Sequence, residues 1–295
     1  MVGVARFLFP DFAEVLLLGY QMNIGYVCTN FNNSDFTEVA VQTLVESSVH
    51  HFSVVVVDNC SEEHEIKKLL ELAKKFRQVK LIASSVNVGY FAGLNLGIQY
   101  LRDVRPDIGW MIVGNNDLEF QGDFGEMLSA RVPDLSEFAV IAPDIVTDDG
   151  EHQNPHVIAG ISRVREIFYD LYYANFHLGR LIFWLASRFR VVVDRADERQ
   201  WQTSQHIHQG HGSCYVLTPH FFEQFEALWA PTFMMSEEFF LSKQLSNVGQ
   251  QVFYDPSLKV LHHCHAALVK IPSRKRWEMA RDAHRVYRQH VRGLW

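Results

Sequence analysis

Two apolar segments of this chain end in polar residues, and a predicted helix lies between them. Residues 52–57 are a nearly continuous β-branched run that ends at Asp58 and Asn59. Residues 110–113 are a second apolar run, which leads to Asn115-Asn116-Asp117. Such runs are typical of buried parallel strands, whose carboxyl ends meet at one edge of a sheet. Open α/β sheets bind ligands at this edge, so we expect a ligand site there.

Apolar runs and helical periodicity alternate through the first 120 residues. The pattern predicts strands at 24–29, 52–57, 79–83 and 110–113. It also predicts helices from Asp35 or Thr37 to about 48, over 62–76 and over 93–101. This order predicts an α/β fold with a mainly parallel central sheet and helices on both faces.

The pattern is less regular after residue 139. Its apolar segments predict strands at 140–145, 213–217, 251–254 and 258–261. Helices are predicted over 164–190 and 219–225, and after Ser236, which we expect to cap its helix. No clean linker is visible, so we predict that the two halves share one core.

Bulk properties narrow the class of protein. The length of 295 residues and the apolar fraction of 48% fit one large globular domain. A formal net charge of -7 gives no reason to expect a nucleic-acid partner. The four cysteines follow no paired spacing, which predicts free thiols and a cytoplasmic location. Charged residues and Pro10 interrupt the apolar N-terminus, so we expect neither a membrane span nor a cleaved signal there.

The C-terminal segment has the opposite charge. Residues 270–295 carry eight Lys or Arg against Glu278 and Asp282. One interpretation is a basic helix in peripheral contact with the inner face of an anionic membrane. The other is a solvated helix face that packs on the domain through Trp277 and Tyr287. The sequence leaves both open.

Three polar positions at the predicted edge suit particular ligand groups. Asp58 can accept a hydrogen bond from a nucleobase N–H, although an acid at a strand end also serves as a turn or helix cap. The loop 87–95 contains glycines that let the backbone approach a diphosphate. Asp117 suits a hard divalent cation, although Asn-Asn-Asp is also a good turn sequence.

The second half adds an acidic pair and a late histidine in a matching order. Glu237-Glu238 lies within 233–241, and the run 254–263 ends in two histidines. With the motifs of the first half, this order resembles the inverting GT-A glycosyltransferases of family 2, especially the rhamnosyltransferase-like and capsular-polysaccharide branch. The resemblance covers residues 22–268.

The resemblance implies a role for each matching residue. The acidic pair would supply the catalytic base, with Glu238 at the usual aspartate position and Glu237 beside it. Asp117 and His262 would bind a Mg²⁺ or Mn²⁺ ion. Donor-binding residues would be Asn32, Asp58, Asn59, Asn87, Gly89, Asn95, Asn115 and Asn116. Acceptor-side residues would be Gln153, Asn154, His211 and Gly212.

The resemblance also implies a division of the chain into three parts. Residues 1–21 would be an N-terminal appendage, 22–268 the GT-A domain and 269–295 a basic C-terminal helix. Within the domain, 22–120 would bind the nucleotide, and 121–268 would hold the acceptor and the catalytic groups.

The implied reaction moves a sugar from a UDP- or dTDP-sugar to a hydroxyl of a glycan or lipid-linked acceptor in surface polysaccharide synthesis. A carboxylate would remove the hydroxyl proton, and the oxygen would displace the nucleoside diphosphate with inversion. A divalent cation would neutralise charge on the departing group. The chain departs from the family pattern in its Glu-Glu pair, which is often Glu-Asp, and in a triplet that lacks its first acid.

Other functions stay open or are disfavoured. A sugar nucleotidyltransferase would use a similar sheet, but it normally has a Gly-rich basic segment where this chain has Thr29–Asn32. A catalytically inactive sugar-binding protein would not need the acidic pair. No Gly-x-Gly-x-x-Gly follows the first strand, which argues against a dinucleotide-binding oxidoreductase. Structural zinc at 262–265 is disfavoured because adjacent residues of a strand point to opposite faces.

Overall fold

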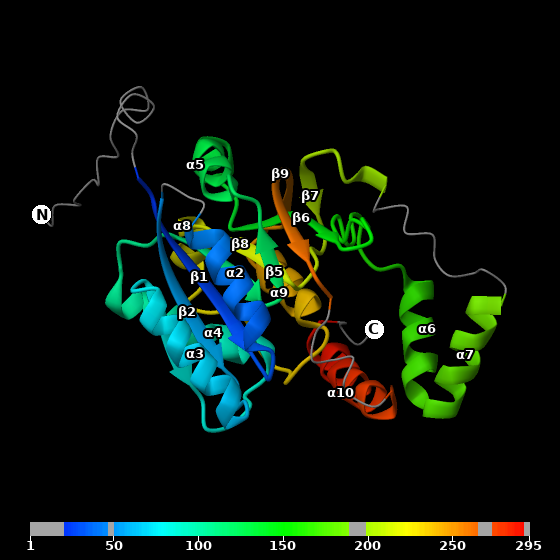
Figure 1. The fold of residues 1–295 in the computed structure, drawn as a ribbon. Helices are drawn as coiled ribbons and strands as arrows, with labels where there is room; N and C mark the ends of the chain where they lie inside the picture. The colour runs from blue at the N-terminus through cyan, green and yellow to red at the C-terminus, as the bar shows by residue number, and fades with distance from the viewer. Residues whose placement is uncertain (1–20, 47–49, 189–198, 265–272, 292–295) are drawn as a thin grey trace, which may run out of the picture.

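The apolar runs of the sequence form a nine-stranded open sheet in the order β3-β2-β1-β4-β8-β6-β9-β5, with β7 paired to β9 (Figure 1). The computed structural model describes residues 21–46, 50–188, 199–264 and 273–291, so nearly all of the predicted N-terminal appendage lies outside the described residues. The strands are β1 (Asn23–Asn30), β2 (His51–Asp58), β3 (Val79–Ala83), β4 (Trp110–Asn115), β5 (Leu118–Phe120), β6 (Val140–Thr147), β7 (Gln205–Ile207), β8 (Cys214–Leu217) and β9 (Val252–His262).

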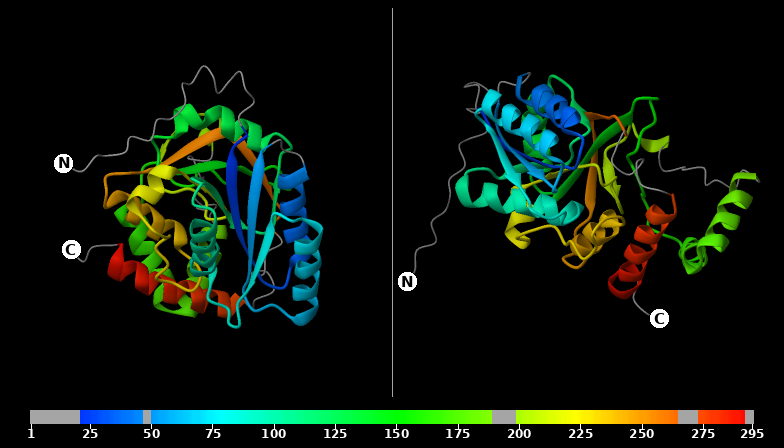
Figure 2. Two further views of the ribbon diagram at one scale, coloured as in Figure 1. Left: turned by 90° about the vertical axis from the view of Figure 1, so that its left-hand side faces the viewer. Right: turned by 60° about the horizontal axis from the view of Figure 1, so that its bottom comes forward.

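Helices cover both faces of the sheet (Figure 2). One face packs against α2, α3 and α5, and the other against α4, α8 and α9. The helices are α2 (Ser34–Glu46), α3 (Glu63–Lys75), α4 (Tyr90–Val104), α5 (Phe124–Leu135), α6 (Arg163–Ala174), α7 (Phe176–Arg188), α8 (Pro219–Gln224), α9 (Glu237–Ser246) and α10 (Ser273–His290).

The run of valines in β2 shows why the sheet is buried on both sides. Val54 and Val56 contact the α2–α3 side, whereas Val55 and Val57 contact the α4 side, and all four are at most 1% exposed. Successive side chains of a strand point to opposite faces, so a continuous apolar run needs a cover on each face. The predicted α/β class with helices on both faces is confirmed.

The sheet is parallel in its N-terminal half and mixed in the other half. Strands β3, β2, β1 and β4 are parallel neighbours. Beyond β4, β8 pairs antiparallel with both β4 and β6, while β6 and β9 are parallel. The short strands β5 and β7, which the sequence pattern did not predict, pair antiparallel with β9. The predicted parallel order therefore applies to the strands before residue 116.

Several predicted boundaries differ from the structure. The helix predicted over 164–190 is two helices, α6 and α7, separated by extended backbone at Asn175. The strands predicted at 251–254 and 258–261 are one strand, β9, which pairs with β6 across a register shift between Pro143 and Asp144. Helix α4 begins at Tyr90 rather than Gly93, and α5 was not predicted.

The predicted cap of α9 is wrong. Ser236 precedes the helix, but its φ of 67° is left-handed and its side chain makes no cap hydrogen bond. A capping side chain needs an extended backbone to reach back over the first turn.

The basic C-terminal segment forms α10, which packs beside α6. Of the helices in the described part of the chain, none combines the length and the apolar character that crossing a membrane requires.

Candidate active site

The carboxyl ends of three parallel strands lie together, as the sequence predicted. Asn30 of β1 is in register with Asp58 of β2, and Thr29 is in register with Asn115 of β4. The predicted donor-binding residues after these strands are therefore brought to one edge of the sheet. The hydrogen bonds of these residues show which side chains connect the strand ends to the neighbouring loops.

Asp58 is buried and already accepts two hydrogen bonds. Asn30 Nδ2 donates to its Oδ1 at 2.8 Å, and the backbone N–H of Ser61 donates to its Oδ2 at 3.0 Å. These bonds tie the end of β1 to the loop after β2. A nucleobase N–H would have to share an oxygen that is already paired, which a carboxylate allows because each oxygen has two lone pairs.

Asn116 and Asn32 serve mainly to hold the backbone in this structure. The buried Asn116 Nδ2 lies 2.7 Å from Thr37 Oγ1 and 2.8 Å from Asn33 Oδ1. Asn32 is left-handed, and its Oδ1 accepts the backbone N–H of Glu62 at 2.8 Å. Both were predicted to bind the donor, and in this structure both hydrogen-bond to residues from distant parts of the chain.

Three further asparagines shape the predicted diphosphate loop. Asn59 Nδ2 donates to the Gly89 carbonyl at 2.9 Å, and Asn87 Oδ1 accepts the Gly89 N–H at 3.0 Å. Asn95 bonds both the N–H and the carbonyl of Leu228, at 2.9 and 2.8 Å. The amides of these asparagines are therefore used to fix the loop and its helix α4 in place.

Gly89 joins the loop to the segment that carries the acidic pair. Its φ is 92°, and the next residue, Tyr90, donates its N–H to the Phe233 carbonyl at 3.0 Å. A Cβ on Gly89 would lie 1.9 Å from that carbonyl oxygen. The position therefore excludes a side chain both by backbone conformation and by space.

We expect Gly89→Ala to destabilise the protein by at least about 3 kcal/mol, because it adds a backbone clash to the strain of a positive φ. Gly150→Ala is the matched control, since Gly150 has a φ of 83° but no atom within 4 Å of an added Cβ. The control should cost only about 1–2 kcal/mol. Urea unfolding of both variants measures the difference, and equal losses would show that the contact with Phe233 does not constrain Gly89.

Asp117 and His262 meet where β5 pairs with β9. Oδ1 of Asp117 lies 3.2 Å from Nε2 of His262, and both side chains are buried. Among the described residues, none donates a hydrogen bond to either carboxylate oxygen of Asp117. A buried carboxylate without donors is costly, so these oxygens indicate a place for a cation.

Gln153 determines how His262 presents its nitrogen to Asp117. Oε1 of Gln153 lies 2.7 Å from Nδ1 of His262, which places the proton of a neutral imidazole on Nδ1. Nε2 then keeps its lone pair, and Asn115 Nδ2 approaches the same nitrogen at 3.3 Å as a donor. Metal-binding histidines are commonly oriented by such a partner on the other nitrogen. Gln153, predicted on the acceptor side, is also a neighbour of the predicted metal ligand.

The donor set fits a hard divalent cation that also binds a diphosphate. A carboxylate and an imidazole supply two ligands, and Mg²⁺ and Mn²⁺ sites commonly take the others from phosphate oxygens and water. No group of three or more His, Cys, Asp or Glu that could hold a metal occurs among the described residues. His263 contacts Asp148 and Glu119 at 2.9 and 3.1 Å instead, and His265 lies outside the described residues.

We expect Gln153→Leu to weaken Mn²⁺ binding about tenfold or more, because His262 loses the acceptor that fixes its tautomer. Gln153→Glu retains an oxygen acceptor and should keep most of the affinity. Electron paramagnetic resonance of free Mn²⁺ gives the dissociation constants without an activity assay. Unchanged affinity in the leucine variant would remove Gln153 from the site.

The predicted acceptor-side residues lie next to His262 and Glu238. Asn154 is fully buried and links the Pro143 carbonyl to the His211 N–H, each at 2.8 Å. The His211 and His262 rings are 5.8 Å apart. Glu238 Oε2 would lie 3.7 Å from a Cβ on Gly212, so Gly212 leaves room beside this carboxylate. These contacts connect the acidic pair to the Asp117–His262 pair through the segment 211–212.

The surroundings of Tyr90 show that Asp117 and Glu237 lie near the same side chain. Its hydroxyl donates to the Gly212 carbonyl at 2.7 Å. Burial raises the pKa of the Tyr90 phenol well above its usual value, and the charges of Glu237 and Asp117 raise it further. The sequence analysis did not single out Tyr90, because only folding brings its hydroxyl to Gly212. Its place inside the glycine-containing loop was the available signal.

The two glutamates at the start of α9 have different environments. Glu237 is 7% exposed, and its Oε1 has no hydrogen-bond partner in the part of the chain that the structure describes. Burial, followed by the charge of Glu238, raises the pKa of Glu237 to about 8. Glu238 is half-buried. Near neutral pH Glu237 is therefore mostly protonated, which leaves Glu238 to carry the negative charge of the pair.

We expect Glu237→Gln to gain stability relative to the native protein as pH rises. The native Glu237 pKa of about 8 lies above its ordinary value of 4.5, so stability falls as pH rises between these two values and levels off once Glu237 ionises above about pH 8. Glutamine removes this loss, which amounts to about 2 kcal/mol between about pH 6 and 9. Urea unfolding at the two pH values tests the sign, and a pH-independent difference between the proteins would contradict it.

Comparison with known proteins identifies the family. The model of glycosyl transferase family 2 matches residues 27–178, more than half of the chain. The chain belongs to this family. One curated relative is N-acetylglucosaminyl-diphospho-decaprenol L-rhamnosyltransferase from Mycobacterium tuberculosis. It is 25% identical to this chain over 225 residues, which cover 72% of this chain and 66% of the relative.

Solved structures show that this family 2 protein has the GT-A fold. S. aureus TarS 1-349 has a TM-score of 0.52 at 10% identity, with 82% of this chain and 60% of that chain covered. Mannosyltransferase PcManGT from Pyrobaculum calidifontis, in complex with GDP-Man and Mn²⁺, has a TM-score of 0.51 at 12% identity, with 92% and 62% covered. GalNAc-T7 with UDP, GalNAc and Mn²⁺ has a TM-score of 0.53 at 13% identity, with 84% and 44% covered.

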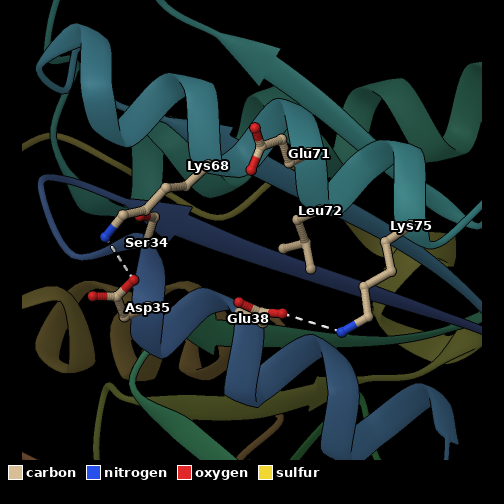
Figure 3. Close-up of a pocket in the computed structure, with 7 residues that line it drawn as sticks. All are labelled: Ser34, Asp35, Glu38, Lys68, Glu71, Leu72 and Lys75. Atoms are coloured by element: carbon tan, nitrogen blue, oxygen red, sulfur yellow. Dashed lines mark hydrogen bonds and ion pairs between the residues drawn. The ribbon is translucent and has the colours of Figure 1, made fainter.

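A cavity of about 300 Å³ lies between α2 and α3 (Figure 3), and neither the acidic pair nor Asp117 nor His262 lines it. Lys68 pairs with Asp35 at 2.7 Å and Lys75 with Glu38 at 3.1 Å across its mouth. The pairs are largely exposed, and such pairs contribute little to stability. We find no catalytic constellation there.

Proposed function

We propose that the protein is an inverting, metal-dependent glycosyltransferase that uses a UDP- or dTDP-sugar. The observation that carries this proposal is the buried carboxylate of Asp117, whose oxygens have no hydrogen-bond donors and face Nε2 of His262. Membership of family 2 supports the transfer reaction, and two of the solved relatives were crystallised with Mn²⁺ and a nucleotide or nucleotide sugar. The bound cation would neutralise charge on the diphosphate leaving group.

The residues of this chain then perform a single displacement. Glu238 accepts the proton of an acceptor hydroxyl, and the hydroxyl oxygen forms a bond to the anomeric carbon. The bond from that carbon to the diphosphate oxygen breaks, and the nucleoside diphosphate leaves with its electron pair. Neutral Glu237 avoids a second buried negative charge beside Glu238. The configuration at the anomeric carbon inverts.

The acceptor we propose is a hydroxyl of a glycan or a lipid-linked sugar in surface polysaccharide synthesis. The name of the mycobacterial relative describes transfer of rhamnose to a diphospho-decaprenol-linked sugar, which supports a lipid-linked class. We also propose a cytoplasmic location, which the four free cysteines support. Residues 22–268 form the proposed catalytic domain, since strands from both of its halves share one sheet.

The test is a panel of nucleotide sugars with Mn²⁺, assayed for thermal stabilisation and for release of nucleoside diphosphate. The proposal expects stabilisation and slow hydrolysis of one UDP- or dTDP-sugar, both abolished by a chelator. Stabilisation by a donor without release, even with a panel of glycan acceptors, would indicate a binding protein. Release of pyrophosphate from a nucleoside triphosphate and a sugar phosphate would indicate a nucleotidyltransferase.

A further inference from the structure

Exposed apolar side chains are concentrated on the hairpin of α6 and α7. Nine of the seventeen large exposed apolar residues in the described chain lie between positions 164 and 185. On α6 they are Val164, Ile167, Phe168 and Leu171, exposed by 46–64%. On α7 the largest are Phe183 and Trp184, exposed by 68% and 59%. Such a concentration of exposed apolar side chains commonly marks a binding surface.

The apolar residues of α6 lie on a side of the helix separate from its contacts with α10. Glu166 accepts a hydrogen bond from Tyr287 at 3.0 Å, and Asp170 pairs with His284 at 2.9 Å. Residues 164, 167, 168 and 171 repeat at helical spacing and form a separate stripe. The polar side of α6 is therefore used to hold α10, while the apolar stripe faces solvent. The hairpin projects from the rest of the molecule beside α10 (Figures 1 and 2).

The same three helices carry an excess of positive charge. Residues 163–188 and 273–290 contain ten Lys or Arg against four acidic residues, although the whole chain has a net charge of -7. Arg274 and Arg285 of α10 are 71% and 66% exposed. Exposed aromatic and aliphatic residues beside basic residues are the composition of helices that lie in a membrane interface. Helices of 12 and 13 residues are too short to cross a bilayer.

We propose that the α6–α7 hairpin inserts its apolar side chains into the surface of an anionic lipid bilayer, with the basic residues of α10 at the headgroups. Charge decides between this occupant and a second copy of the chain. Two copies would bring like-charged basic surfaces together, whereas anionic lipid complements them. This docking surface is distinct from the substrate site and does not rest on the proposed function.

Docking would place the candidate active site near the bilayer. The Phe239 ring of α9, next to Glu238, lies 4.8 Å from the Tyr287 ring of α10. The base of the proposed reaction is thus one contact away from the helix that faces the headgroups. This consequence rests on the proposed function, and it would suit an acceptor whose lipid portion stays in the membrane.

The experiment is co-sedimentation of the full chain with vesicles of equal parts phosphatidylcholine and phosphatidylglycerol, compared with phosphatidylcholine alone. We expect binding to the mixed vesicles that weakens with added salt. The triple variant Phe168→Ser, Phe183→Ser and Trp184→Ser should bind at least about tenfold more weakly, because three large apolar groups no longer enter the interface. The variant Arg274→Glu with Arg285→Glu should lose the preference for phosphatidylglycerol.

The matched control replaces exposed apolar residues elsewhere, as Leu70→Ser, Val86→Ser and Val104→Ser. It should bind the vesicles like the native protein, and circular dichroism should show that all variants are folded. Absent vesicle binding, or equal weakening by the control, overturns the proposal. Sedimentation velocity that shows a dimer lost only in the hairpin variant, without vesicle binding, assigns the surface to a second copy and also overturns it. Sugar transfer to a soluble acceptor reports on the proposed function separately.

Discussion

Replacing Glu238 by glutamine should slow sugar transfer about 1000-fold while donor binding stays close to native. Glutamine keeps the size of the side chain but cannot accept the acceptor's proton. The environment of the acidic pair supports this choice of base. Glu237 has a pKa raised to about 8 and is mostly protonated near neutral pH, whereas Glu238 is half-buried beside Gly212. Single-turnover transfer and calorimetric donor binding measure the two effects separately.

Glu237→Gln is the control for this prediction, because glutamine resembles the protonated acid that already occupies the position. We expect its transfer rate near pH 7 to stay within about tenfold of native. If Glu237→Gln loses the activity and Glu238→Gln keeps it, the base is Glu237. Its raised pKa would then confine activity to alkaline pH, with a rising limb centred near 8.

The strands before residue 116 were predictable because their environment leaves one interpretation. The valines of β2 are buried on both faces, so the apolar run itself marks a central strand, and β3 has the predicted bounds. The strand tips at Asn30, Asp58 and Asn115 followed from topology alone, since parallel neighbours end at one edge. The pairing of Asp117 with His262 was predicted only through the resemblance to a family.

The errors in helix and strand boundaries arose where the same local sequence pattern is compatible with either a continuous or an interrupted element. The amphipathic stretch 164–190 contains no Pro, and its one glycine, Gly179, lies within the periodic pattern, so the periodicity predicted one helix. Asn175 interrupts it, and its Oδ1 accepts the N–H of His177 at 2.8 Å as an N-cap does. Asparagine is a strong N-cap residue, and this was the available signal. The gap left between the strands predicted at 251–254 and 258–261 contains Pro256, and β9 continues through it.

The roles of the polar site residues could not be predicted, because they depend on contacts between distant parts of the chain. Gln153 and His262 are 109 positions apart, and Asn95 and Leu228 are 133 positions apart. A sequence motif gives the side-chain type at a position but not its partner. The predicted donor residues Asn59, Asn87 and Asn95 also hydrogen-bond to the backbone of the protein, and Gln153 contacts a predicted ligand.

Replacing Asp117 by asparagine should abolish Mn²⁺ binding and reduce transfer about 1000-fold, since a carboxylate ligand at the leaving group is lost. The same change should make the metal-free protein more stable. Asp117 is 1% exposed and its oxygens receive no hydrogen bonds, so the native carboxylate is a buried charge held without donors. An amide removes that charge at nearly the same volume. We expect a gain of about 1–3 kcal/mol in urea unfolding without metal, and no thermal shift when Mn²⁺ is added.

Asp58→Asn makes the comparison decisive, because it is the same chemical change at another fully buried strand tip. Asp58 accepts from Asn30 Nδ2 and from the Ser61 N–H, so an amide there would set a donor against a donor. That variant should lose about 1–3 kcal/mol where Asp117→Asn gains it. Opposite signs of the two stability changes would mean that Asp58 is a structural hydrogen-bond acceptor. They would also mean that Asp117 is a destabilising buried charge whose role is to bind a cation. If Asp117→Asn also destabilises the metal-free protein, the contact between Asp117 and His262 is structural and the proposed metal site is wrong.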